Sequence, residues 1–197
     1  VGARSPLTGI WGQASCGGNF GPELKRCGYD AVILKGKAEE PVFLLLGEGS
    51  ADLLPADDLW GMDTYETTDA LKERYGKGAK VLAIGPASEN LIPFGSIVND
   101  YGHVFGRAGM GTVMGSKNLK AVAVRGNGQV PLAEGERFKT LVREMLHILK
   151  DDSLTEALRV TGTAGTLDYL MLLGSPPNRY FTEGEFPEAE ALSGSTM

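Results

Sequence analysis

The sequence predicts an α+β protein whose strands come before its helices. Before about residue 130, short apolar runs alternate with turn residues, as strands do. After it, apolar residues recur three and four positions apart, as on one face of a helix. Hydrophobic residues make up 42% of the 197 and charged residues 22%, which is enough apolar material for a packed core. We therefore expect two parts, residues 1–130 and 131–197.

In the first part, strands are expected where apolar runs meet turn residues, at 31–35, 42–46, 51–54, 80–84, 94–98 and 119–124. The first two are expected to be neighbours joined by a turn. A short helix carries Pro22 in its first turn and ends at Gly28. A longer helix begins at a capping box formed by Asp63 and Glu66, and ends at Gly76.

In the second part, helices are expected at 138–149, 154–160 and 164–172. The first of these is amphipathic, and we expect its apolar stripe to pack in a core. The stripe consists of Phe138, Leu141, Val142, Met145, Leu146 and Leu149. The last stretch, 180–197, is acidic and predicted to be a loop.

Glycine is unusually frequent, at 28 of the 197 residues, roughly twice its average share. Many lie in two runs, residues 15–24 (the first glycine run) and 102–120 (the second glycine run). Glycine weakens helices and strands, so such runs indicate left-handed turns or a backbone that approaches something closely. The second run also carries Arg107 and opens a helix. This layout predicts a backbone cradle for an anionic, phosphorylated ligand.

Two common phosphate-binding motifs are absent from the second glycine run. The spacing of Gly109, Gly111 and Gly115 departs from G-x-G-x-x-G, and no strand runs directly into Gly109. A dinucleotide-binding fold is therefore disfavoured. A P-loop is disfavoured too, because no G-x-x-x-x-G-K-[ST] sequence is present.

Charge, the length of apolar stretches and cysteine content argue against further classes of protein and of site. The net charge of −6 argues against a nucleic-acid binder. No apolar stretch is long enough to span a membrane, and no signal peptide is recognised. The two cysteines cannot complete a four-ligand metal site, and their low number fits a reducing compartment. Cys27 is expected to be buried. Cys16 lies in the first glycine run, and contact of Cys16 with a ligand is an alternative to a purely structural role.

Few polar side chains near the glycine runs suggest a definite chemistry. His103 lies close to Arg107, and it either donates to a phosphate or bonds the backbone of its turn. Asn99–Asp100 is expected to form an Asx-turn, with a direct ligand contact as the alternative. Glu23 is expected at the surface or paired with a basic neighbour, and His147 on a solvated helix face. No Ser-His-Asp set can be recognised.

Several long motifs resemble the tungsten- and molybdenum-containing aldehyde ferredoxin oxidoreductase family. They are SPLTG at 5–9, GGNFGPELK at 17–25, GYD at 28–30 leading to GKA at 36–38, IGPASEN at 84–90, ND at 99–100 and GRAGMGTVMGSKNLKA at 106–121. The family typically writes the last block AGRGGxGAVMGSKNLKA. The resemblance is nearly unbroken from residue 5 to 126 and weaker beyond.

The resemblance implies an enzyme that oxidises aldehydes to carboxylic acids with water. Two electrons pass through a [4Fe-4S] cluster to ferredoxin or a similar carrier, and the metal is held by two pyranopterins. Residues 1–130 would be the cofactor-base domain, of α+β type with two sheets, and 131–197 the start of a helical domain. The chain would then be a piece of a longer cytoplasmic protein, acting as a homo-oligomer or with electron-transfer subunits.

The resemblance also implies which residues hold the cofactor. A magnesium ion between the two pterin phosphates would be bound by the backbone carbonyls of Ser15 and Val104. The other expected cofactor contacts are Cys16, Gly17, Gly18, Asn19, His103, Gly106, Arg107 and Gly109. No catalytic residue is assigned to this chain, and the iron–sulfur ligands would lie outside it.

Two departures from the usual sequence of the family leave two alternative functions open. Ser15 stands where well-known members carry Asn, and His103 replaces an arginine, for which Arg107 would compensate in part. One alternative is a related reductase of an activated aromatic or other acid. The other is a non-catalytic member of the family. The sequence does not decide between tungsten and molybdenum, because the metal is held by pterin sulfur.

Overall fold

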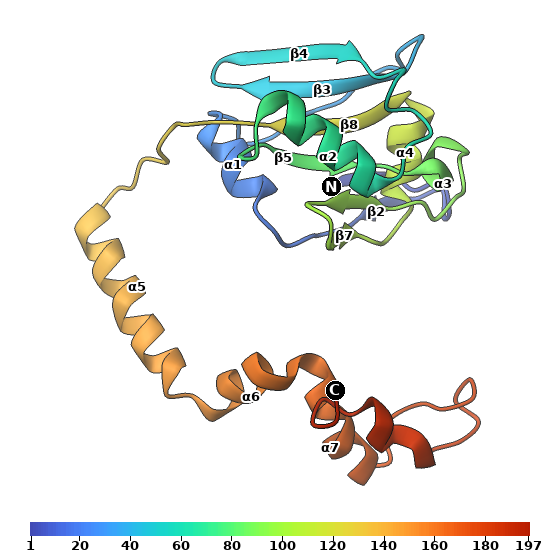
Figure 1. Cartoon of the computed structure of the whole chain (residues 1–197), viewed down its shortest axis with the longest axis vertical. Coiled ribbons are helices and arrows are strands. Elements are labelled where there is room, and N and C mark those ends of the chain that lie inside the picture. Colours follow the sequence, from blue (N-terminus) through green and yellow to red (C-terminus); the bar gives the residue numbers. More distant parts are fainter. The chain divides into compact units, whose positions relative to one another are not determined.

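The computed structural model describes all residues, 1–197. They form two compact units, residues 1–130 and 131–197. The first unit contains both sheets of the protein, and the second contains only helices, turns and loops (Figure 1). The predicted α+β class with two sheets is therefore confirmed. None of the helices combines the length and apolar character needed to cross a membrane.

The larger sheet has six strands in the order β4-β3-β8-β5-β6-β7. The strands are β3 (Val42–Gly47), β4 (Ser50–Pro55), β5 (Lys80–Ala83), β6 (Ile97–Asn99), β7 (His103–Phe105) and β8 (Leu119–Val124). β3 and β8 run parallel, and the other pairs are antiparallel. All six residues of β8 are buried, because the sheet is covered on both faces there.

Helices cover the two faces of this sheet with separate apolar clusters. The helices of this unit are α1 (Phe20–Arg26), α2 (Thr64–Tyr75), α3 (Pro86–Glu89) and α4 (Met110–Ser116). Val122 and Val124 of β8 pack with residues of α1 and α4, while Ala121 and Ala123 pack with residues of α2. Alternate residues of a strand point to opposite faces, so β8 contributes to both clusters.

A two-stranded sheet leads into the first glycine run. β1 (Gly2–Arg4) pairs with β2 (Trp11–Gln13) in antiparallel register. A Cβ at Gly12 would lie 2.6 Å from the Cβ of Ala108. The small sheet therefore packs directly on the second glycine run, and Gly12 allows that approach.

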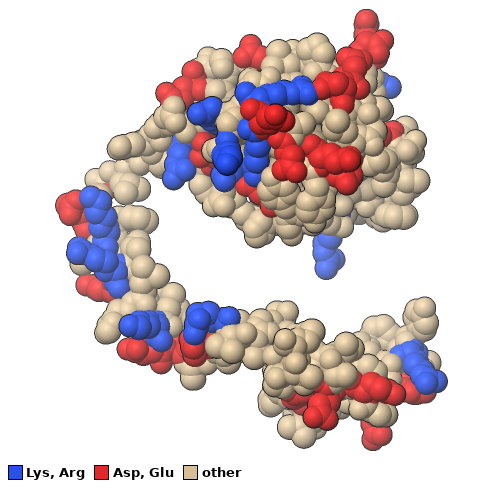
Figure 2. All heavy atoms as spheres, viewed as in Figure 1, with Lys and Arg blue, Asp and Glu red and all other residues tan.

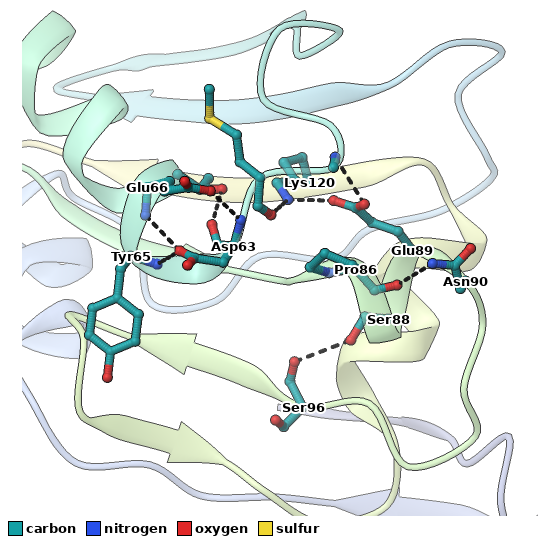
Figure 3. Close-up of polar contacts among 12 residues, drawn as sticks. Asp63, Tyr65, Glu66, Pro86, Ser88, Glu89, Asn90, Ser96 and Lys120 are labelled. Atoms are coloured by element: carbon teal, nitrogen blue, oxygen red, sulfur yellow. Dashed lines mark hydrogen bonds and ion pairs between the residues drawn. The ribbon is translucent and has the colours of Figure 1, made fainter.

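The predicted capping box of α2 is confirmed (Figure 3). The carboxylate of Asp63 accepts the N–H groups of Tyr65 and Glu66, each at 2.8 Å. The Glu66 carboxylate in turn accepts the Asp63 N–H at 2.9 Å. α2 ends at Gly76 as expected, and Gly28, with φ of +90°, follows the end of α1.

Two strand predictions were wrong in whole or in part. Residues 31–35 are not a strand, and Ile33 is 81% exposed. β3 is already paired with β4 on one edge and β8 on the other, so no edge of it is left for this segment. The strand expected at 94–98 begins only at Ile97, because the Gly95 N–H turns back to the Ile92 carbonyl at 2.9 Å.

The second unit contains the expected helices but not the expected core. Its elements are α5 (Gly135–Lys150), α6 (Ser153–Thr161), η1 (Gly162–Thr166), α7 (Leu167–Leu172) and η2 (Pro187–Leu192). No residue of α5 is buried, and the six residues of its stripe are 40–61% exposed. The prediction of core packing for this stripe was wrong for this chain. His147 is exposed, as expected.

Acidic and basic side chains are interspersed on the surface. Lys and Arg (blue in Figure 2) lie among Asp and Glu (red) on the visible face of each unit, without a broad basic surface there. This distribution agrees with the net charge of −6. It gives a nucleic-acid backbone no continuous partner on that face.

A buried ion pair joins β8 to α3. The Lys120 side chain is fully buried, and its Nζ donates to the Glu89 carboxylate and, at 2.7 Å, to the Met62 carbonyl (Figure 3). The second oxygen of Glu89 accepts the Gly61 N–H at 3.0 Å. Burial lowers the pKa of Lys120, and the Glu89 charge opposes that shift. The pair fastens the loop before α2 to the central strand.

Replacing Lys120 by methionine should destabilise the protein by about 3–5 kcal/mol, because Glu89 would be left buried without its partner. Arg74→Ala, which breaks the exposed Asp58–Arg74 pair, should cost much less, since solvent screens that pair. Urea unfolding of both variants measures the difference. Equal effects of the two substitutions would show that the Lys120 pair does not stabilise the sheet.

Candidate functional site

A hollow of about 690 Å³ lies on the first unit, where the first glycine run meets β7. Gln13, Ala14, Ser15, Val104, Gly106 and Arg107 line it. Four of the ten expected cofactor contacts therefore line the same hollow, namely Ser15, Val104, Gly106 and Arg107. Ser15 is separated from the other three by almost 90 residues of sequence. Gln13 and Ala14 were not expected, because nothing in their local sequence indicates a site.

Both walls of the hollow are continuous with paired strands. The wall at Ser15 continues from β2, and the Ala14 N–H donates to the Val1 carbonyl at 3.0 Å. The wall at Val104 is β7 itself, which pairs with β6 in the register Val98 to Val104. The backbone on each side is therefore held by hydrogen bonds that do not involve a ligand.

Gly17 and Gly18 bring the first glycine run against β7. A Cβ on Gly17 would lie 3.3 Å from His103 Nδ1. Gly18 has φ of +90°, and a Cβ there would lie 2.8 Å from His103 Cδ2 and 2.5 Å from Asn99 Nδ2. The imidazole packs beside these glycines and makes no hydrogen bond within the chain. Gly18 needs glycine for the close approach and for the left-handed backbone, whereas at Gly17 a methyl group would make only a tight contact with the His103 ring.

The remaining residues of the first glycine run differ in exposure. Cys16 is partly buried, and its Sγ lies 3.3 Å from the Gly17 carbonyl oxygen. Burial raises the pKa of the Cys16 thiol, although the Asn99 side chain acts in the opposite direction. Asn19 is exposed at the start of α1 and does not cap it with its side chain.

The burial of Cys27 agrees with its prediction, whereas that of Glu23 does not. Cys27 is 4% exposed, as predicted. Glu23 pairs with Arg26 at 3.0 Å, which was expected, but it is buried rather than at the surface. Its other oxygen accepts the Gly126 N–H at 2.9 Å, so Glu23 links α1 to the end of β8.

The later glycines of the second glycine run allow close packing within the protein and do not line the hollow. Gly109 is buried with φ of +67°, and a Cβ there would collide with the Pro93 carbonyl oxygen. Gly111 and Gly115 would collide in the same way with the carbonyl oxygens of Ser96 and Ser88. The geometry therefore gives Gly109 no place in the hollow. The expected helix α4 is present, but its first residues pack against the protein.

The hollow offers two kinds of binding group. The Arg107 guanidinium is exposed and makes no ion pair within the chain, so it can donate to a phosphate. Main-chain carbonyl oxygens, as at Ser15 and Val104, are hard ligands that suit Mg²⁺. No group of three or more His, Cys, Asp or Glu side chains is arranged to hold a metal ion. The residues present therefore fit a phosphate-bearing ligand with a backbone-bound magnesium ion.

Comparisons with known proteins relate the chain to one family. The family model described as "Aldehyde ferredoxin oxidoreductase, N-terminal domain" matches residues 1–126. The tungsten-containing aldehyde ferredoxin oxidoreductases of Pyrococcus furiosus and Thermococcus kodakarensis are each 40% identical to the chain over 196 residues. These alignments cover 98% of the chain and 32% of each relative, so the chain spans about a third of their length.

A solved structure is similar as well. It is the active site complex BamBC of benzoyl coenzyme A reductase in complex with 1,5-dienoyl-CoA, with a TM-score of 0.72 and 37% identity. The similarity covers 76% of this chain and 23% of that one. The family match and the 40% identity across almost the whole sequence show that this chain belongs to the aldehyde ferredoxin oxidoreductase family.

Proposed function

We propose that the protein containing this chain oxidises aldehydes to carboxylic acids, and that residues 1–130 form the base for its tungsten or molybdenum bis-pyranopterin cofactor. The proposal rests on one observation, namely that Ser15, Val104 and Arg107 line the same hollow. Family motifs far apart in the sequence assign these three residues to one cofactor, and they line one space.

Each part of the hollow suits a part of this cofactor. Arg107 would donate to a pterin phosphate. The carbonyls of Ser15 and Val104 would bind the magnesium ion that accompanies the phosphates. Gly17 and Gly18 would let the first glycine run lie close enough to His103 and Asn99 to form this wall. The changes at Ser15 and His103 leave the backbone oxygens in place, so these residues remain compatible with the proposal.

The residues of this chain bind and orient the cofactor, and none is assigned to catalysis. When bound, the cofactor supplies the two-electron redox chemistry of the reaction, in which an aldehyde and water give a carboxylic acid, two protons and two electrons. We further propose that the electrons leave through a [4Fe-4S] cluster to ferredoxin or a similar carrier in the cytoplasm. Residues 131–197 would begin the helical domain of the enzyme.

A second function is favoured by one observation. The similar solved structure belongs to a reductase of an aromatic coenzyme A thioester, at 37% identity. Its name assigns that substrate to the relative only. For this chain, a reductase of an activated aromatic acid is therefore the alternative, and a non-catalytic member of the family is the third possibility.

Metal analysis and assay of the purified protein separate these functions. After growth with both tungstate and molybdate, we expect bound tungsten or molybdenum and aldehyde-dependent reduction of a low-potential dye. Bound metal with turnover of an aromatic thioester but of no aldehyde would establish the alternative. Absence of both metals would contradict every enzymatic function proposed here.

Gly18→Ala should remove most of the bound metal and pterin, because alanine is strained by about 1–3 kcal/mol at a left-handed position and its methyl group meets Asn99 and His103. Gly21→Ala is the matched control, since Gly21 has open space and no positive φ. Metal content and pterin fluorescence of the purified variants give the comparison, with circular dichroism to verify folding. Full cofactor content in folded Gly18→Ala would contradict the assignment of this wall.

A further inference from the structure

The turn between β6 and β7 connects the two walls of the hollow. Asn99 ends β6 and pairs with His103 in the β6–β7 ladder. Its Nδ2 also donates to the Gly17 carbonyl at 2.7 Å, across 82 residues of sequence. A single side chain of β6 therefore fixes the first glycine run, which continues one wall, beside β7, which forms the other.

Packing alone does not explain an amide at position 99. The Asn99 side chain is 1% exposed, and its Oδ1 is buried without a hydrogen-bond partner. An unmatched buried acceptor destabilises a fold relative to an apolar side chain of similar shape. The bond from Nδ2 to Gly17 is the interaction that only an amide provides here.

The turn itself is held in an uncommon conformation by side chains of α2 and β5. Asp100 and Tyr101 have φ of 43° and 71°, values that residues other than glycine seldom adopt. The Asp100 carboxylate pairs with Lys72 at 3.0 Å and with Lys80 at 3.8 Å. The Tyr101 hydroxyl donates to Asp69 at 2.6 Å, and the Lys72 Nζ lies 4.4 Å from the centre of its ring.

These contacts form a continuous connection from α2 to the hollow. Lys72 and Asp69 hold the turn, the turn holds Asn99, and Asn99 holds Gly17. Ser15 lies two residues before Gly17, and Val104 lies next to His103, the ladder partner of Asn99. The spacing between the two walls is therefore set by bonds within the protein.

We propose that Asn99 is a positioning residue for the hollow, which holds the backbone of Ser15 and Val104 at a fixed separation before the phosphate-and-magnesium part of the cofactor binds. The inference rests on the proposed function, because it names how that site is prepared. Preorganisation of this kind lowers the ordering cost of binding.

The test uses the complete protein that contains this chain and two separate measurements. The first is the rate at which iodoacetamide alkylates Cys16 in protein expressed without tungsten or molybdenum, read by peptide mass spectrometry. Cys16 precedes Gly17, so its exposure reports whether the anchor holds. Because the Asn99 side chain also lowers the pKa of the Cys16 thiol, the alkylation rate compared is that of the thiolate, taken from a pH profile of each variant, and buried Cys27 is the internal standard. The second is the metal and pterin content of protein grown with both metals.

Asn99→Ala should raise the Cys16 alkylation rate and lower the cofactor content, each by about fivefold, as the removal of one hydrogen bond predicts. Asn90→Ala is the matched control and should change neither quantity. Its amide donates at 2.9 Å to the Pro86 carbonyl within the α3 segment (Figure 3), and Asn90 does not line the hollow.

The outcomes separate failure of the inference from failure of the proposed function. Unchanged Cys16 alkylation in Asn99→Ala overturns the inference. Faster alkylation with full cofactor content also overturns it, because the anchor would then serve the fold only. A wild-type protein without tungsten, molybdenum or pterin overturns the proposed function, and the inference with it, and this result is visible in the wild type alone.

A second variant covers the case in which Asn99→Ala does not fold. Asp100→Asn keeps a residue type that tolerates the left-handed backbone and removes the charge that binds Lys72 and Lys80. It should change both measurements in the same directions by about twofold, since these ion pairs act on Gly17 only through the turn and Asn99. No change in either measurement overturns the inference.

Discussion

The candidate site depends on how closely the first glycine run approaches β7. A side chain at Gly18 would meet His103 and Asn99, and one at Gly17 would lie tightly against His103, while the amide of Asn99 fixes this approach. Without it, Ser15 would belong to a loop after the two-stranded sheet and Val104 to the short edge strand of the larger sheet. With it, the two residues line one hollow.

The rest of the first unit keeps this arrangement in place. β8 is buried along its whole length, and both apolar clusters are built on it. Lys120 ties β8 to α3 and to the loop before α2, while α2 holds the turn that carries Asn99. A fold with one central buried strand can therefore support a site formed by short loops and three-residue strands, because few of its elements can move independently.

The sequence predicted those features that depend on local chemistry. The capping box at Asp63, the helix stop at Gly28 and the strand at 119–124 follow from neighbouring residues, and all are present. The resemblance to the family predicted a shared role for Ser15 and Val104, which no local pattern would have paired, and both line the same hollow. The individual strands β1, β2 and β7 were not predicted, since three residues are too few for a periodic signal.

The predictions that were wrong concern features that are determined by tertiary contacts. Residues 31–35 have strand-like composition, but both edges of β3 are occupied. Gly109 looked like part of a ligand cradle, and its lack of a side chain instead admits the Pro93 carbonyl. Asn99 was expected to make a local turn, and its decisive bond reaches Gly17, 82 residues away. Such long-range partners cannot be inferred from spacing along a single chain.

The most direct test is a crystal structure of the cofactor-loaded protein with Mn²⁺ in place of Mg²⁺, located by its anomalous scattering. We predict one Mn²⁺ ion in the hollow, bonded to the backbone oxygens of Ser15 and Val104, with Arg107 facing a phosphate. A hollow without an ion, or an ion bound only by side chains elsewhere, would contradict this prediction.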